Sequence, residues 1–96
     1  MSNPRQVQKR IVNALQQGHI IQCVKTKDIR SGGRMHVSIG PQKAAVRGSL
    51  PPYCLITTGR YPSSARHWSY GTAIEAAQDF IELVGRSIAW AAVNKA

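Results

Sequence analysis

The stretch RMHVSIG, residues 34–40, carries the clearest strand pattern of the chain. Its apolar residues alternate with polar ones, which is typical of a strand that buries one face and exposes the other. The preceding residues 19–27 are rich in β-branched side chains, and Gly32-Gly33 allows the chain to reverse between the two segments. The sequence therefore predicts a β-hairpin whose second strand exposes Arg34 and His36.

Two further segments extend this pattern on either side of the hairpin. Residues 3–17 predict a helix, with a proline at the first helical position and Gly18 as the stop signal. Residues 53–59, YCLITTG, follow two prolines and predict a third strand. Residues 41–52 are compatible with a short helical turn or an extended segment, and we expect a loop there.

A final helix is predicted from a capping box and a long apolar stripe. Thr72 and Glu75 form a Thr-x-x-Glu box, and apolar residues then recur at spacings of three and four. The stripe comprises Ile74, Ala77, Ile81, Val84, Ile88 and Ala91. Glu75 and Asp79 suit the positive end of the helix dipole, so these acids have a structural explanation and need no catalytic one.

The predicted order of elements is helix, strand, strand, strand, helix. It indicates an α+β fold, a helix–three-stranded antiparallel sheet–helix in which the helices pack on one sheet face and the other face is open. The chain has 96 residues, 43% of them hydrophobic and 18% charged, which is enough for one modest core. We therefore expect residues 1–96 to form a single compact basic domain.

The positive charge is concentrated in the first three quarters of the chain. Thirteen Lys and Arg against four Asp and Glu leave a net charge of +9, and residues 1–71 hold eleven of these bases but only one acid. A domain this basic typically binds a polyanion, such as nucleic acid or an acidic protein surface.

The sequence contains no motif for a cofactor, a metal site or a membrane segment. Cys23 and Cys54 lie 31 residues apart without a histidine at metal-ligand spacing, so we expect reduced thiols, no metal and no cofactor. The N-terminus lacks the apolar core of a signal peptide, and the longest apolar run, residues 88–93, is too short to cross a bilayer. We expect a cytoplasmic protein without a membrane partner.

The stretch RYPSSARHWSYG, residues 60–71, combines two arginines, a histidine and three of the six aromatic residues without a carboxylate. Guanidinium groups neutralise phosphates and aromatic rings stack on bases, so the stretch predicts a nucleic-acid-binding loop. Its candidate contact residues are Arg60, Arg66, His67, Trp68 and Tyr70. In the alternative interpretation, Trp68 and Tyr70 fill the edge of the core.

The hairpin provides a second candidate surface. Lys25, Lys27, Arg30 and Arg34 surround its turn, and His36 joins Arg34 on the outer face, so a basic finger that contacts phosphates is predicted. Alternatively, these charges protect an exposed strand from aggregation.

Enzymatic activity is not expected, and no residue is assigned as catalytic. Metal-dependent hydrolysis of phosphodiesters needs several convergent carboxylates, which the sequence does not supply. A metal-independent ribonuclease would need only a histidine and a cation, for which His36 with Arg34 or His67 with Arg66 are the candidates.

Two function classes fit these features. The first is a small non-catalytic nucleic-acid-binding protein that uses the basic hairpin and the basic and aromatic loop. The second is a phage or mobile-element inhibitor of the anti-defence or anti-CRISPR type, which binds a host protein or ribonucleoprotein complex. A homodimer through the C-terminal helix is a further hypothesis, because that helix carries more apolar surface than three strands would cover.

Overall fold

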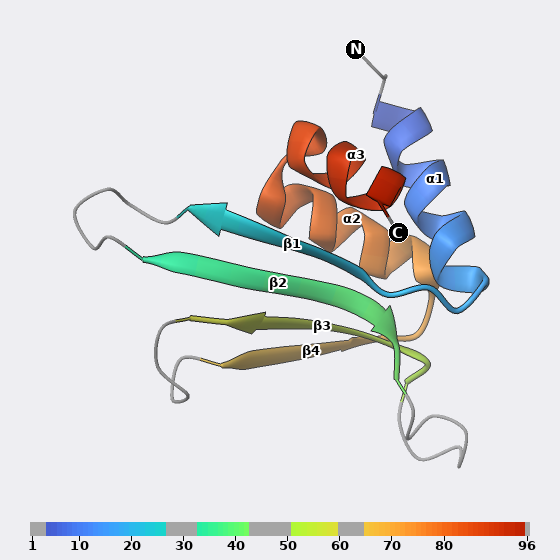
Figure 1. Cartoon of the computed structure of the whole chain (residues 1–96). Helices are drawn as coiled ribbons and strands as arrows, with labels where there is room; N and C mark the ends of the chain where they lie inside the picture. Colours follow the sequence, from blue (N-terminus) through green and yellow to red (C-terminus); the bar gives the residue numbers. More distant parts are fainter. Residues whose placement is uncertain (1–3, 27–32, 43–50, 60–64, 96) are drawn as a thin grey trace.

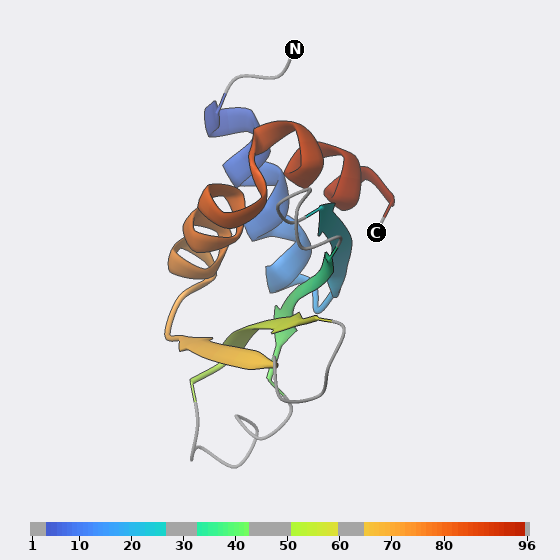
Figure 2. The same cartoon turned by 90° about the vertical axis from the view of Figure 1, so that its left-hand side faces the viewer.

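The computed structural model describes residues 4–26, 33–42, 51–59 and 65–95. They form α1 (Pro4–Gln16), β1 (Ile21–Thr26), β2 (Arg34–Pro41), β3 (Tyr53–Thr58), β4 (Arg66–Tyr70), α2 (Ala73–Val84) and α3 (Arg86–Lys95). The strands pair in the order β1-β2-β3-β4 as one antiparallel sheet, and the helices lie together on one side of it (Figures 1 and 2). The predicted α+β class and antiparallel sheet are confirmed, whereas the predicted numbers of strands and helices are wrong.

The fourth strand, β4, lies where the sequence predicts a loop. Its register with β3 pairs Tyr53 with Tyr70, Leu55 with Trp68 and Thr57 with Arg66. Four of its five residues are exposed, because β4 is an edge strand that the helices leave largely uncovered. Without burial there is no alternation of apolar and polar residues, so the sequence carries no strand signal there.

The predicted final helix is two helices, because Gly85 interrupts it. Gly85 has φ 90° and ψ 155°, a conformation open essentially only to glycine, and its N–H donates to the carbonyl of Ile81 over 2.7 Å. The break redirects the chain, so that α2 packs on β3 and β4 whereas α3 packs on β1. The apolar period continues across residue 85, which is why the sequence predicts one helix.

The start of α2 agrees with the predicted capping box. Thr72 is the N-cap in an extended conformation, and its side-chain oxygen accepts a hydrogen bond from the backbone N–H of Glu75 over 3.2 Å. This bond satisfies one of the donors that a helix N-terminus leaves unpaired.

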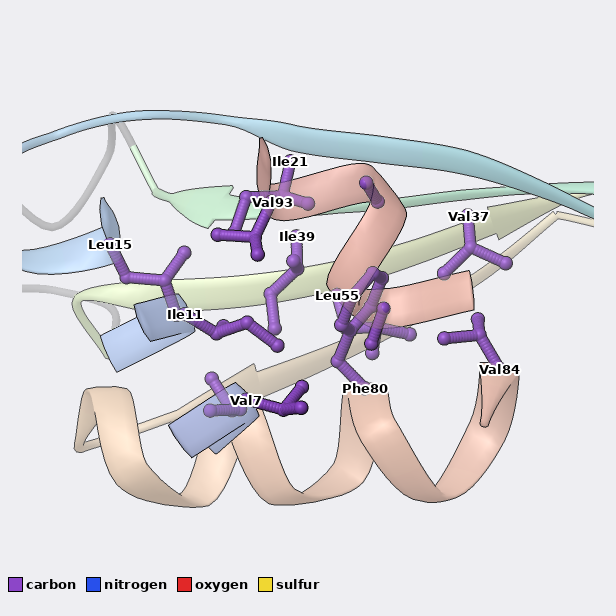
Figure 3. Close-up of a cluster of buried hydrophobic side chains, with 14 of the residues drawn as sticks. Val7, Ile11, Leu15, Ile21, Val37, Ile39, Leu55, Phe80, Val84 and Val93 are labelled. Atoms are coloured by element: carbon purple, nitrogen blue, oxygen red, sulfur yellow. The ribbon is translucent and has the colours of Figure 1, made fainter. Parts of the chain in front are cut away.

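The core lies between the helices and the sheet, with Phe80 of α2 at its centre (Figure 3). Helix α1 contributes Val7, Ile11 and Leu15, and the strands contribute Ile21, Val37, Ile39 and Leu55. Burying each of these side chains stabilises the fold by roughly 1.5–3 kcal/mol before conformational entropy is subtracted. Three members of the predicted stripe lie outside the core, since Ile74 is 51% and Ile88 37% exposed and Ala91 is exposed as well.

Helix α1 packs against both α2 and α3, and so covers much of the apolar surface of the C-terminal half. None of the helices described here has the length and apolarity needed to cross a membrane.

Candidate nucleic-acid interface

Strand alternation divides the sheet into two faces with different chemistry. One face meets the helices; the other, which we call the open face, carries no helix (Figure 2). Cross-strand pairing sets the members of the open face in rows, for example Gln22, Ser38, Ile56 and His67 across all four strands. Its other members include Val24, Arg34, His36, Thr58 and Ser69.

The open face carries many polar side chains and, over its described residues, no carboxylate. A hollow of about 370 Å³ lies on β1–β3, with Gln22, His36, Ser38 and Thr58 among its lining residues. Arg34, His36 and His67 are exposed around it. Amide, hydroxyl and imidazole groups here can donate hydrogen bonds to phosphate and sugar oxygens, and Arg34 adds a permanent positive charge.

Glycine at position 40 shapes one margin of this face. A Cβ at Gly40 would lie 2.9 Å from Cγ1 of Ile20, so the missing side chain lets Ile20 fold over the sheet. Ile20, Val24 and Ile56 are exposed, and they give the open face an apolar component beside its polar one.

The hairpin residues do not all reach the open face. Arg34 and His36 lie there, as predicted. Lys25 instead lies on the same side of β1 as the core residue Ile21, so it points to the helices, where its Nζ donates to the carbonyl of Leu83 over 2.5 Å. This carbonyl is at the negative end of α2, where a cation is favourable. Lys27 and Arg30 lie outside the described residues.

The residues of the predicted basic and aromatic loop are separated in the same way. Because Arg66–Tyr70 form a strand rather than a loop, Arg66, Trp68 and Tyr70 lie on the helix side, and only His67 lies on the open face. A ligand lying flat on either face of the sheet would therefore not meet all four side chains. Arg60 lies outside the described residues.

The helix side of β4 borders a cleft of about 390 Å³ that the sequence does not predict. We call it the aromatic cleft; it is lined by Lys25, Leu55, Trp68, Tyr70, Asp79, Glu82 and Leu83. Trp68 is 44% exposed in it. From the sequence, Asp79 has only a role at the positive end of the helix dipole, because nothing in the spacing of residues 68, 70, 79 and 82 indicates that the strand and the helix meet.

Tyr70 joins the edge strand to α2 in this cleft. Its hydroxyl donates to Oδ2 of Asp79 over 2.8 Å. Burial, and secondarily the hydrogen bond and negative charge of Asp79, raise the pKa of Tyr70 well above its ordinary value. The Tyr70 phenol therefore stays protonated and donates this hydrogen bond. Tyr70 thus has a structural role, as in the alternative interpretation of the sequence in which it fills the edge of the core.

Two histidine–arginine pairs are the candidates for ribonuclease chemistry, and only one of them lies on a single face of the sheet. Arg34 and His36 share a strand face, whereas His67 and Arg66 point to opposite faces of β4. Both cysteines are reduced and half-buried, and burial raises their thiol pKa values, which disfavours the nucleophilic thiolate. Among the residues described, no three His, Cys, Asp or Glu side chains gather as a metal site would require.

Comparison with known proteins gives no match to a protein-family model, a curated protein or a solved structure. The case for a function therefore rests on the chemistry of the open face and of the aromatic cleft.

Proposed function

We propose that this chain is a small non-catalytic nucleic-acid-binding protein that contacts the phosphate backbone through the open face of its sheet. The observation that carries this proposal is the gathering of Arg34, His36 and His67 on one exposed surface whose described residues include no carboxylate. The described acids instead lie together on α2. A polyanion can therefore approach the open face without meeting a like charge.

The composition of the open face favours backbone contacts over base stacking. None of its described residues is Trp, Tyr or Phe, so large π-faces on which bases could stack are lacking among them. Polar donors such as Ser38 and Thr58 suit phosphate and sugar oxygens. We therefore expect binding with little sequence preference.

Salt dependence tests the proposal. Fluorescence anisotropy of labelled single-stranded and double-stranded oligonucleotides should show affinity falling steeply as salt is added, because phosphate contacts release counterions. Each phosphate that a Lys or Arg neutralises should contribute about −0.7 to −0.9 to the slope of log affinity against log salt. If protein freed of nucleic acid binds neither oligonucleotide, or binds independently of salt, the proposal is wrong.

Binding to a host protein or ribonucleoprotein complex is the second candidate function. The exposed Trp68 in the aromatic cleft favours it, because tryptophan is enriched at the centres of protein interfaces. The two functions use opposite faces of the sheet, so single substitutions separate them. A variant at Trp68 that binds oligonucleotides normally but no longer binds a purified protein partner would favour this second function.

Self-association through the C-terminal helix stays a hypothesis. The apolar surface that motivates it is reduced, since α1 packs on α3 and Arg10 lies over the ring of Trp90, 5.6 Å from its centroid. Ile88 is the exposed large hydrophobic residue of α3. Light scattering decides the question, and a monomer mass of 10.5 kDa would contradict the hypothesis.

A further inference from the structure

The aromatic cleft combines an exposed indole with negative charge, which is unusual in so basic a chain. Asp79 and Glu82, two of the four carboxylates in the sequence, line it together. Lys25 also lines it and contributes one positive charge, so two negative charges and one positive charge leave a net charge of −1. Trp68 and Tyr70 supply aromatic surface beside these charges.

We propose that the aromatic cleft binds an arginine side chain of a protein partner, with the guanidinium stacked on Trp68 and paired with the carboxylates of α2. This inference deepens the second candidate function, because it names the chemical group that the partner presents. It does not depend on nucleic-acid binding by the open face, which lies on the opposite side of the sheet.

The charge and the aromatic ring of the cleft both favour a guanidinium group as its ligand. A cation over the face of an indole is attracted by the ring quadrupole, and tryptophan is the best of the aromatic residues in this respect. One added positive charge would neutralise the net charge of the cleft. Arginine suits the site better than lysine, because its planar guanidinium stacks on the ring while its edge donates two parallel hydrogen bonds to a carboxylate.

The net charge of +9 does not prevent this binding. At physiological salt the Debye length is about 8 Å, so bases farther than this from the cleft are largely screened from it. Arg66 is nearer, since it lines the adjoining hollow together with Trp68 and Leu83. The carboxylates that line the cleft contact a bound cation directly and are screened much less. Asp79 already accepts a hydrogen bond from Tyr70, which holds its carboxylate in place, and Glu82 is exposed and available for pairing.

The test is an NMR titration of the whole chain with a blocked tripeptide, acetyl-Gly-Arg-Gly-amide. The indole N–H signal of Trp68 is the readout, and it is assigned with a Trp90→Phe variant, since the chain has two tryptophans. A second tripeptide replaces arginine with citrulline, which has nearly the same shape but no charge. The matched variants are Glu82→Gln and, as a control on the same helix but outside the cleft, Glu75→Gln.

We expect saturable shifts of the Trp68 signal with the arginine peptide and at least about tenfold weaker binding of the citrulline peptide, because charge-assisted hydrogen bonds are lost. Glu82→Gln should weaken binding of the arginine peptide, whereas Glu75→Gln should not. Equal binding of the two peptides, an unchanged affinity in Glu82→Gln, or no saturable shift at millimolar peptide would each overturn the proposal. Failure of the nucleic-acid proposal would appear separately, as an absence of oligonucleotide binding.

Discussion

Leu55 and Trp68 are direct cross-strand partners on β3 and β4, yet Leu55 is 2% exposed and Trp68 is 44% exposed. Both side chains are on the helix side of the sheet. Helix α2 packs on both β3 and β4, and both side chains line the aromatic cleft, but only the one on the edge strand stays partly exposed. Leu55 is therefore a core residue, whereas its partner Trp68 is a candidate contact residue.

This relationship predicts unequal costs of substitution at the two positions. Leu55→Ala should lower the free energy of unfolding by about 2–5 kcal/mol, because it leaves a cavity in a packed core. Trp68→Leu should cost only about 1 kcal/mol, since much of the indole is already in water. Urea unfolding of both variants measures the difference. Equal losses would mean that Trp68 belongs to the core.

Gly85 should be required for its backbone conformation rather than for space. Gly85→Ala should destabilise the chain by about 1–3 kcal/mol, because φ 90° is strained for any residue with a Cβ. Gly71→Ala is the matched control, since a Cβ there also meets no atom within 4 Å but the backbone has no positive φ. Thermal unfolding should therefore show a clear loss for Gly85→Ala only, and similar behaviour of both variants would contradict this explanation.

Tyr70 should make stability fall at alkaline pH. Because its pKa is raised in the folded state, the unfolded chain loses the phenolic proton first as pH rises above about 10, the ordinary value for tyrosine. The stabilisation from Tyr70 is thus complete below that pH and is lost progressively above it. Comparison of wild type with Tyr70→Phe isolates this contribution.

The free energy of unfolding of Tyr70→Phe should be about 0.5–1.5 kcal/mol lower than that of wild type at neutral pH, because the hydrogen bond to Asp79 is lost. The difference between the two proteins should then shrink as pH rises above 10. Urea unfolding across this range measures it. A difference that does not change with pH would show that Tyr70 titrates equally in both states.

Arg34 should contribute to nucleic-acid binding through one phosphate contact. Arg34→Ala should weaken oligonucleotide binding and reduce the magnitude of the salt slope by about 0.7–0.9. Arg86→Ala removes the same charge from the start of α3, away from the open face, and should leave the slope unchanged. Anisotropy titrations at several salt concentrations give both slopes. Identical slopes for the two variants would place the interface elsewhere.

Elements that bury a periodic face could be predicted from the sequence alone. Helix α1, the β1–β2 hairpin, β3 and the N-cap at Thr72 lie within a few residues of their predicted bounds. Their side chains alternate between core and solvent, so burial leaves a readable pattern in the sequence. The outward direction of Arg34 and His36 could be predicted for the same reason.

Four features are seen only in the folded chain: the position of β4, the position of Lys25, the break at Gly85 and the aromatic cleft. Strand β4 is held by backbone pairing with β3, which depends little on side-chain identity, so Arg66–Tyr70 carry no strand pattern. Its alternation then places Trp68 and His67 on opposite faces. The contact of Tyr70 with Asp79 joins a strand to a helix, and such a contact between elements has no period along the chain from which it could be predicted.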